Sequence, residues 1–462
     1  MNRLLLVLAT AVSCAGSKAS TARQPLAGDV SILDFGARGA GNDDRTAIQA
    51  ALNAGAGGTV HVPAGRWFVS RAGSAYFALT IPAGTTLVGE SRDSSVLLPL
   101  GNTAPSVRVL EVDAPGVTIQ SLGVDGSAIA ADGNHQRHCV FARGPGLALR
   151  DVRLTGCSGD GLYLYPGADG ATLDRVVSER NGRNGATVNA SGTTVTASMF
   201  RLNAAQQFDS EPGSPGHVDN VRITGSTFDA MGASADYVLT ICGSAGGQSA
   251  NWFAHGNTIN GGTYIAWASD IELSRNAGLN PTAKSSVSVY RTAERVRIAD
   301  NTFAVPAAEY NIAITGTGTG QAATDVTVTG NRLSGGKYGI GVSGAVSVTI
   351  ADNVLTGRDG VAAIAVRATN PLVPFATATL RHNTATGHDR GLSVAGMVGS
   401  TPTLTLLVAS DNALGGSMYL DEGSGALQRA ELTNNTPATV ARWPAGAVLG
   451  NDGATVVMTR SP

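Results

Sequence analysis

The sequence predicts an all-β fold: a single-stranded parallel β-helix (a solenoid) with one capping helix at its N-terminus. Three observations predict it. Short β-type stretches recur from about residue 107 onward, and each ends in a turn that contains Asn, Gly or Ser. These turns return with a period of about 22 residues, which suits one coil of a solenoid whose longer coils loop out on one side. Helical periodicity of apolar residues is nearly absent from this region, whereas it is clear at residues 45–52.

The composition excludes several classes of protein. Glycine contributes 60 of the 462 residues, and charged and aromatic residues only 14% and 5%, so the chain departs from an average globular composition. A hydrophobic fraction of 43% is nevertheless enough for a packed core, which argues against disorder. The net charge of −2 gives no electrostatic footprint for nucleic acid. A mean hydropathy of +0.07 with short apolar runs argues against a membrane-embedded body.

Residues 1–28 are expected to form a targeting segment and a tether. A basic start is followed by an apolar run at residues 4–12, which is too short to span a bilayer and has the proportions of a secretory signal. The stretch Ala11-Val12-Ser13-Cys14 resembles a bacterial lipoprotein signal in which Cys14 would be lipidated. A plain cleaved signal and a frayed cytosolic N-terminus are the alternatives. We therefore expect an outer-membrane or cell-surface lipoprotein, otherwise a periplasmic or secreted protein, whose membrane contact is limited to a lipid at Cys14.

Residues 29–106 are expected to form an N-terminal cap and the first coils. Asp43 or Asp44 can cap the N-terminus of a helix. This helix would cover the open end of the solenoid, whose first coil would otherwise expose strand edges. Its apolar face consists of Ala47, Ile48, Ala51 and Leu52.

The same region carries a resemblance to a known family. Two stretches resemble the N-terminal cap of the pectate-lyase-like superfamily: Val30–Leu52, which contains the motif Asp34-Phe35-Gly36-Ala37, and Gly58–Gly65. Its members are right-handed parallel β-helices, so the resemblance implies a right-handed solenoid. It implies no activity, because the motifs of the polygalacturonase, mannuronan epimerase and calcium-dependent pectate lyase branches are missing from this sequence.

Residues 107–435 are expected to form the coils of the β-helix, and residues 436–462 a C-terminal cap. Asn recurs at the turns because a sharp turn needs a residue that tolerates the left-handed conformation, and stacked Asn amides can hydrogen-bond along the axis. A capped solenoid needs no second subunit, and we expect a monomer. The turn residues are Cys157, Asn181, Asn203, Ser226, Asn257, Asn276, Asn301, Asn331, Asn353, Asn383, Asn412 and Asn435.

The cysteines and carboxylates give no sign of a metal or cofactor. Cys139, Cys157 and Cys242 leave one cysteine unpaired in the body of the chain, and no Cys/His cluster accompanies them. We expect all three to be small buried hydrophobic residues. Calcium would need several oxygen ligands together, and outside Asp43-Asp44 the sequence shows no dense acidic cluster. No cofactor is therefore expected.

Three consecutive coils share one spacing, which predicts a functional face. The first strand residue lies five positions after the turn in each coil, which turns Leu162, Ala186 and Phe208 inward. Alternation then directs two rows of side chains outward. The first row is Tyr163, Thr187 and Asp209, and the second row is Tyr165, Asn189 and Glu211. Because tyrosines and carboxylates on one face can transfer protons, the candidate catalytic residues are Tyr163, Tyr165, Asp209 and Glu211.

Residues that can hold a substrate lie near this face. Arginines in the same coils can meet a uronate carboxylate through two hydrogen bonds. A polar insertion at residues 125–138 carries two histidines and can overhang the strands. A tryptophan several coils later offers a stacking surface for a sugar, with packing against a loop as the alternative. The candidate substrate-binding residues are Arg143, Arg180, Arg183, Asn189, His135, His138 and Trp267.

Two classes of function remain open. The first is an enzyme acting on an extracellular acidic polysaccharide. We favour a lyase, in which an Arg neutralises the uronate, a Tyr or His removes the C5 proton and a Tyr protonates the departing oxygen. A glycoside hydrolase with Asp209 and Glu211 as acid and base, or a C5-epimerase, would use the same scaffold. The second class is a non-catalytic carbohydrate-binding surface protein. Perturbed carboxylates beside an Arg in a groove would favour the enzyme, and a line of aromatic side chains without them would favour binding.

Overall fold

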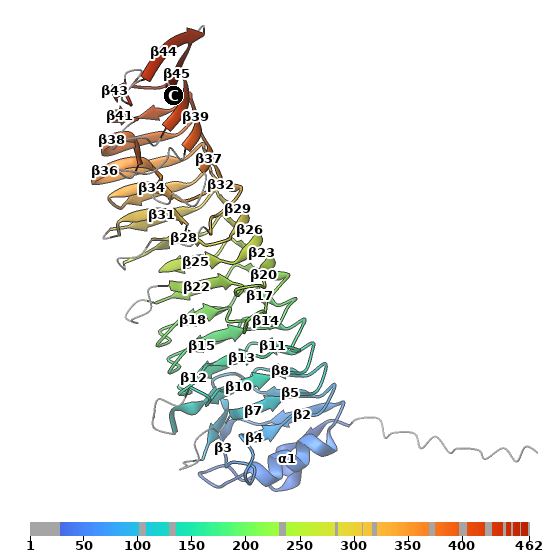
Figure 1. Cartoon of the computed structure of the whole chain (residues 1–462). Coiled ribbons are helices and arrows are strands. Elements are labelled where there is room, and N and C mark those ends of the chain that lie inside the picture. The colour runs from blue at the N-terminus through green and yellow to red at the C-terminus, as the bar shows by residue number, and fades with distance from the viewer. Residues whose placement is uncertain are drawn as a thin grey trace, which may run out of the picture.

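The chain forms a right-handed parallel β-solenoid, as predicted, with helix α1 (Arg45–Ala54) at one end (Figure 1). The computed structural model describes residues 28–100, 108–128, 135–230, 237–281, 285–306, 308–316, 321–368, 375–396, 404–420, 427–437, 440–444, 447–452 and 454–460. The expected signal segment with Cys14 lies outside these residues, apart from residue 28. Within the described part of the chain, no helix is long and apolar enough to cross a membrane.

The coils stack their strands into three parallel arrays, which we call the first, second and third sheets. The first sheet contains β1 (Val30–Ser31), β2 (Thr59–Val62), β5 (Thr86–Gly89), β8 (Thr118–Gln120), β11 (Ala148–Arg150), β14 (Thr172–Asp174), β17 (Thr194–Thr196), β20 (Val221–Thr224), β23 (Ser249–His255), β26 (Ala268–Ser274), β29 (Glu294–Ala299), β32 (Val326–Thr329), β35 (Ser347–Ala351), β37 (Phe375–Arg381), β39 (Leu404–Ser410) and β42 (Leu427–Thr433).

The second sheet contains β3 (Gly65–Val69), β6 (Ser95–Pro99), β9 (Gly123–Asp125), β12 (Arg153–Thr155), β15 (Val177–Glu179), β18 (Met199–Arg201), β21 (Thr227–Asp229), β24 (Thr258–Asn260), β27 (Ala277–Leu279), β30 (Thr302–Val305), β33 (Arg332–Gly335) and β40 (Ala413–Leu414). The long strands β36 (Val354–Ala368) and β38 (Thr384–Gly396) pair with strands of both the second and the third sheet.

The third sheet contains β4 (Phe77–Thr80), β7 (Arg108–Val112), β10 (Val140–Ala142), β13 (Leu162–Leu164), β16 (Ala186–Val188), β19 (Phe208–Asp209), β22 (Tyr237–Cys242), β25 (Gly262–Ala266), β28 (Val287–Tyr290), β31 (Tyr310–Thr315), β34 (Tyr338–Ser343), β41 (Ser417–Tyr419) and β43 (Val440–Arg442). At the C-terminal end the antiparallel pair β44 (Ala447–Asp452) and β45 (Thr455–Arg460) joins β42 and ends the parallel stacking.

Helix α1 covers the N-terminal end of the solenoid (Figure 1). Its buried residues are three of the four predicted, namely Ile48, Ala51 and Leu52, and they join the solenoid core. The cap differs in detail from the prediction. Asp44 occupies the N-cap position, but its carboxylate accepts the backbone N–H groups of the preceding loop instead of those of the helix. Asp43 accepts the N–H of the first helical residue at 3.2 Å.

The inward row of the third sheet is as predicted. Leu162 pairs in register with Ala186, and Ala186 with Phe208, and all three side chains are fully buried. Phe208 packs edge-on against Trp252, which is also buried. Since every coil contributes apolar side chains to one continuous interior, the core extends along the axis of the solenoid.

The asparagine amides stack as predicted, but along two different corners. Between the first and second sheets, each amide from Asn257 to Asn412 donates to the next carboxamide oxygen at 2.8–3.0 Å, and Asn435 is the last acceptor. Asn181 and Asn203 instead follow strands of the second sheet and form a separate, shorter ladder. The prediction of one continuous series of turns is therefore wrong, because the series changes corner between Asn203 and Ser226.

The reason for asparagine at these turns also differs from the prediction. The left-handed conformation belongs to the residue before the asparagine, for example Gly330 before Asn331. The carboxamide of Asn331 instead satisfies buried backbone groups: its oxygen accepts the N–H of Asn301 at 2.9 Å, and its nitrogen donates to the carbonyl of Ile298 at 2.9 Å. Asparagine recurs because it carries both a donor and an acceptor into a buried corner.

Two of the three body cysteines form a disulfide, which corrects the prediction that all are simple buried hydrophobic residues. Cys139 and Cys157 are bonded, so the segment before β10 is tied to the turn before β13. They are 18 residues apart in the sequence, about one coil. Cys242 remains a free thiol, and burial raises its pKa to about 12, which keeps it unreactive at neutral pH.

Candidate functional site

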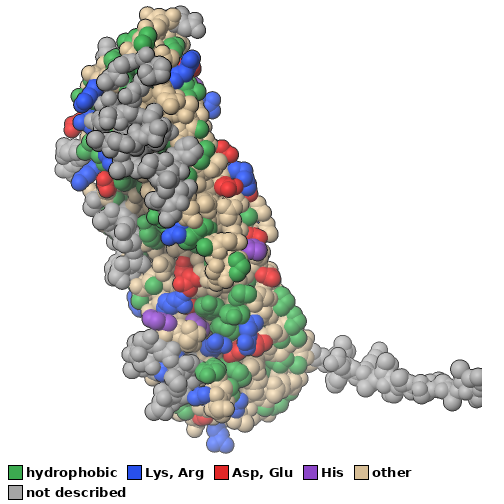
Figure 2. All heavy atoms as spheres, in the orientation of Figure 1, with side chains coloured by type: hydrophobic (Ala, Val, Ile, Leu, Met, Phe, Trp, Pro, Cys, Tyr) green, Lys and Arg blue, Asp and Glu red, His purple; other side chains and the backbone are tan. Residues whose placement is uncertain are grey.

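A groove of about 630 Å³ lies on the third sheet, over β13, β16 and β19. Tyr163, Tyr165, Asn189 and Glu211 line its base, and the segment Pro212–His217 that follows β19 forms a wall. Tyr163 pairs in register with Thr187, and Thr187 with Asp209, as the spacing predicted. Figure 2 shows basic, acidic and histidine side chains close to hydrophobic ones in the N-terminal half of the solenoid.

Tyr163 is half-buried in an aromatic cluster. Its ring stacks on Phe141 from the preceding coil, with centroids 5.5 Å apart, and lies 6.3 Å from the ring of Tyr165, which is 46% exposed. The amide nitrogen of Asn189 donates to the phenol oxygen of Tyr163 at 3.2 Å. Burial raises the pKa of Tyr163 above its usual value, so its phenol is protonated at neutral pH.

Arg183 links the groove to the layer beneath it. Its guanidinium forms an ion pair with Glu211 on the groove side, and on the other side its Nη1 lies 3.6 Å from a carboxylate oxygen of Asp160. The side chain of Arg183 is 19% exposed, whereas Asp160 is fully buried. The groove therefore has a fixed cation at its edge, held by one exposed and one buried carboxylate.

A buried polar network lies under the groove. Asp160 accepts hydrogen bonds from the hydroxyl of Thr187 and from the backbone N–H of Asn184, both at 3.0 Å. The amide of Asn184 donates to Asp209 at 3.1 Å, and the hydroxyl of Thr240 donates to the other oxygen of Asp209. Burial raises the pKa of Asp160 to about 6 and also raises the pKa of Asp209. Perturbed carboxylates of this kind concentrate at functional sites.

His138 lies below the groove instead of lining it. Its side chain is fully buried, and its Nδ1 accepts the backbone N–H of Asp160 at 3.1 Å. Burial lowers the pKa of His138 to about 3, so the imidazole is neutral and its 3.5 Å contact with the Asp160 carboxylate is not an ion pair. Its ring packs 4.9 Å from Tyr163, which places it as a support for the tyrosine.

The three candidate arginines occupy different surroundings. Arg183 borders the groove, as described above. Arg143 is held by Asp113 at 2.6 and 2.8 Å and by Glu111 at 2.5 Å, so its guanidinium is already paired. Arg180 follows β15 of the second sheet, and its Nη1 lies 3.1 Å from the buried Glu179. The prediction grouped Arg180 with Arg183, but the two side chains lie on opposite sides of a corner.

The remaining candidates lie outside the groove lining. His135 is exposed, and its carbonyl passes close to Gly159. Trp267 follows β25, two strands beyond β19 on the third sheet, and the guanidinium of Arg291 stacks on its ring at 3.8 Å. Asp209 is only 5% exposed and does not line the groove either.

His138, Asp160 and Asn184 form one row under the groove, and the sequence analysis did not predict this row. Each residue lies two positions before the first inward residue of its coil, and backbone hydrogen bonds link the three coils at that position. Counting backward from Leu162 and Ala186 would have found it. The wall at Pro212–His217 was missed as well, and its signal is the proline-rich insertion directly after Glu211.

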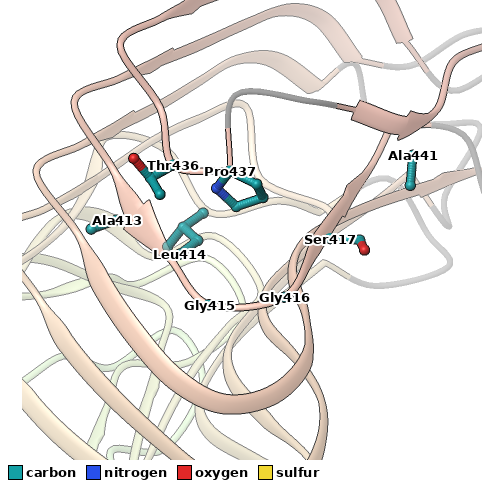
Figure 3. Close-up of a pocket in the computed structure, with 8 residues that line it drawn as sticks. All are labelled: Ala413, Leu414, Gly415, Gly416, Ser417, Thr436, Pro437 and Ala441. Atoms are coloured by element: carbon teal, nitrogen blue, oxygen red, sulfur yellow. The ribbon is translucent and has the colours of Figure 1, made fainter.

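Other hollows lie elsewhere on the solenoid. An arginine-rich groove lies on the second sheet, and a hollow of about 400 Å³ beside helix α1 is lined by Arg38, Asp43 and Asp44 among others. A hollow of about 460 Å³ near the C-terminal end is lined by small and uncharged residues, with Leu414, Thr436 and Pro437 around it (Figure 3). Among the described residues, no group of three or more His, Cys, Asp or Glu side chains is arranged to hold a metal ion.

Comparison with known proteins identifies the fold. No protein-family model matches the chain, and no curated protein matches it in sequence. Solved structures do match it. The catalytic domain of a GH87 α-1,3-glucanase in complex with tetrasaccharides aligns with a TM-score of 0.50 and 12% identity, over 84% of this chain and 68% of that one.

The fold is that of the right-handed parallel β-helix proteins. Two further structures give TM-scores of 0.49. The A-module of the mannuronan C-5 epimerase AlgE6 of Azotobacter vinelandii is 17% identical, over 83% of this chain and 99% of that one. PfbA, a surface adhesin of Streptococcus pneumoniae, is 13% identical, over 94% of this chain and 99% of that one. At these identities the likeness concerns the fold, and β-helices host several unrelated activities.

Proposed function

We propose that this protein is an exported enzyme that cleaves a uronate-containing polysaccharide by β-elimination, with the groove over β13, β16 and β19 as its active site. One observation carries the proposal. A protonated, half-buried phenol (Tyr163) and an exposed one (Tyr165) lie side by side beside an amide and a guanidinium, those of Asn189 and Arg183. Export is supported by the N-terminal signal pattern in the sequence.

The groove supports elimination better than hydrolysis. Hydrolysis of a glycosidic bond needs two carboxyl groups that flank the bond. Asp209 is 5% exposed, and its two oxygens are engaged by Asn184 and Thr240. Glu211 is exposed but paired with Arg183. The two carboxyl groups therefore do not face one substrate position, whereas the two tyrosines line the same groove.

The proposed roles follow from these contacts. The uronate carboxylate displaces Glu211 from Arg183, and its neutralisation by the guanidinium acidifies the C5 proton. Tyr165 takes that proton on its phenol oxygen as it passes its own hydroxyl proton to solvent, and the electron pair forms the C4–C5 double bond while the bond from C4 to the glycosidic oxygen breaks. Tyr163 donates its proton to the departing oxygen, a role that suits a phenol whose pKa is raised. Solvent then restores the proton on Tyr163, which returns both tyrosines to their starting state.

The neighbouring layer supports an enzyme over a passive surface. Asp160 and Asp209 are buried carboxyl groups with raised pKa values close to Arg183. Burial of such groups costs stability, which a surface used only for binding does not require. The network holds Arg183 and the coil of Tyr163 in fixed positions, as a catalytic groove needs.

A second candidate function, glycan binding without cleavage, is favoured by the aromatic side chains further along the third sheet. The rings of Tyr237 and Tyr264 lie 5.1 Å apart, and those of Tyr264 and Tyr290 lie 6.1 Å apart. They come from β22, β25 and β28 and so form a line along the axis. Aromatic lines of this kind provide stacking surfaces for sugar rings.

The test incubates the purified protein with pectate, alginate, hyaluronan, chondroitin and neutral glycans and follows ultraviolet absorbance and reducing ends together. Elimination raises both, because each cleavage creates an unsaturated uronide. Tyr163→Phe and Tyr165→Phe are each expected to lower the rate about 10²–10⁴-fold, the usual contribution of a general acid or base. Tyr76→Phe, which changes an exposed tyrosine outside the groove, is the matched control.

Three results would contradict the proposal. Reducing ends without absorbance would indicate a hydrolase and return attention to Asp209 and Glu211. Elimination that persists in both tyrosine variants would remove the tyrosines from the mechanism. The absence of both signals on every polymer, together with retained binding, would favour the glycan-binding function.

A further inference from the structure

A second groove, of about 460 Å³, lies on the second sheet over β3, β6, β9 and β12 and extends to Arg180 after β15, so only its last two coils are shared with the tyrosine groove. Four arginines line it, namely Arg66, Arg92, Arg153 and Arg180, together with Asp93 and Asp125. Its base includes Val96, Gly123 and Val124. None of the residues assigned to elimination above lines this groove.

The strand register creates the hollow. Arg66 of β3, Val96 of β6, Gly123 of β9 and Arg153 of β12 stand at equivalent positions of four successive strands. The two central positions carry small side chains, and the two outer ones carry arginines. Because successive strands are about 4.8 Å apart, the arginines at the two ends border a notch about 14 Å long.

The lining carries a surplus of positive charge. It holds four guanidinium groups against two carboxylates, a net of +2. Counting the neighbours Arg201, Asp151 and Glu179 as well leaves five guanidinium groups against four carboxylates, a net of +1. This local excess stands out on a chain whose net charge is −2.

A buried carboxylate holds part of the lining in place. Glu179 is fully buried and accepts hydrogen bonds from Arg153 at 2.5 Å and from Arg201 at 2.7 Å. The Nη1 of Arg180 lies 3.1 Å from an oxygen of the same carboxylate. Burial opposes its charge, but the hydrogen bonds from Arg201 and Arg153 outweigh burial and hold the pKa of Glu179 below its usual value. Arg92 is likewise anchored, by Asp151 at 3.1 Å. These guanidinium groups are thus positioned before any ligand arrives.

The anchored arginines retain donors for a ligand. Arg180 is 58% exposed and Arg66 is 60% exposed, and the Asp125 partner of Arg66 lies 3.5 Å away. Within the described residues, the Nε of Arg153 is buried and has no hydrogen-bond partner. Guanidinium forks match planar carboxylates, and an apolar base accepts the face of a sugar ring.

We propose that this arginine-lined groove is a separate binding site for uronate units of an acidic glycan. It lies around a corner from the tyrosine groove: Arg180 and Arg183 flank the turn Asn181-Gly182, one on each side. An acidic chain bound here is held next to the tyrosine groove without entering it. The site needs no cleavage step, so it stands independently of the proposed elimination.

The test uses trigalacturonate as the probe, on the full-length mature protein with Tyr163→Phe to suppress cleavage. Arginine-specific modification by phenylglyoxal, read residue by residue by mass spectrometry, is expected to slow at Arg66 and Arg180 when trigalacturonate is present. Maltotriose, which is uncharged, should have no such effect. Arg332 is the internal control, because it is an exposed arginine of the same sheet that forms no ion pair with any described residue.

Calorimetry completes the test. The double variant Arg66→Gln/Arg180→Gln is expected to weaken trigalacturonate binding at least about tenfold, and Arg332→Gln to leave it unchanged. Both arginines are more than half exposed, so the double variant retains the buried Glu179–Arg153–Arg201 contacts and should fold. Circular dichroism of the variant verifies this, and Arg66→Gln alone, which leaves all Glu179 contacts in place, serves if the double variant is unfolded.

The proposal is overturned if trigalacturonate leaves the modification of Arg66 and Arg180 unchanged, or if the double variant binds as tightly as its parent. It is also overturned if inorganic sulfate binds as tightly as trigalacturonate, because the groove would then be a general anion site. Failure of elimination on every polymer leaves these measurements unaffected. The two proposals can therefore fail separately.

Discussion

Two buried groups under the tyrosine groove titrate in opposite senses, which makes the pH dependence of stability a sharp test of the network. Asp160 has a folded pKa of about 6, against 3.8 for a free side chain. The folded protein therefore binds more protons at this site between these values, and stability falls as the pH rises through that window. His138 has a folded pKa of about 3, against 6.5. Here the unfolded chain binds more protons, and stability falls as the pH drops from 6.5 toward 3.

The expected magnitudes follow from about 1.4 kcal/mol for each pKa unit. Between pH 7 and pH 4, protonation of His138 in the unfolded chain lowers the free energy of unfolding by about 3 kcal/mol. Protonation of the buried Asp160 in the folded protein raises it by about 2 kcal/mol. Together the two groups lower the free energy of unfolding by about 1 kcal/mol on going from pH 7 to pH 4. Asp160→Asn removes the contribution of Asp160, which opposes that of His138. The free energy of unfolding of this variant should therefore fall by about 2 kcal/mol more than that of the parent protein between pH 7 and pH 4. His138→Asn keeps an acceptor near the backbone N–H of Asp160. Its free energy of unfolding should fall by about 3 kcal/mol less than that of the parent protein over the same pH range.

The assay is urea denaturation at pH 7 and at pH 4, followed by tryptophan fluorescence, for the parent protein and both variants. For each protein, the free energy of unfolding at pH 4 is subtracted from that at pH 7. Comparing this difference between a variant and the parent protein cancels the contributions of all other titrating groups. Equal pH dependence in all three proteins would refute the assignment of these pKa values. A greater acid loss in His138→Asn than in the parent protein would show that the imidazole is charged in the folded state.

Three further outcomes are expected. Asn331→Ala should lower the free energy of unfolding by about 2–4 kcal/mol in chemical denaturation, because it leaves buried backbone groups of neighbouring coils without partners. Reduction of the Cys139–Cys157 disulfide should cost about 3 kcal/mol, the loop-closure value for a link of this span, measured by denaturation with and without reductant. Arg183→Gln should lower kcat/KM on the cleaved polymer about 10²–10³-fold, because it removes the guanidinium paired with Glu211 at the groove. Arg143→Gln should change it little, because Arg143 does not line the groove and is held by Glu111 and Asp113 of the preceding coil. Equal losses in the two arginine variants would contradict the assigned roles.

The amino-acid sequence alone was enough to predict the architecture and much of the groove face. Alternation of side chains and the length of a coil are local properties, so the solenoid and the terminal helix could be predicted from periodicity alone. The fixed spacing between turn and strand correctly predicted the row of Tyr163, Thr187 and Asp209, because parallel strands in register carry that alignment from coil to coil.

The corner and the sheet that each polar residue occupies became visible only in the folded structure. Arg180 and Arg183 are three positions apart, yet one binds Glu179 on the second sheet and the other binds Glu211 at the tyrosine groove. Three other features depend in the same way on the corner or sheet that a residue occupies. They are the two asparagine ladders, the pairing of Cys139 with Cys157, and the burial of Asp209. A turn in a solenoid rotates the chain onto another face, and the lengths of turns and strands together decide where that rotation falls. A repeat period measures only the full coil, so it carries no information about the corners within it.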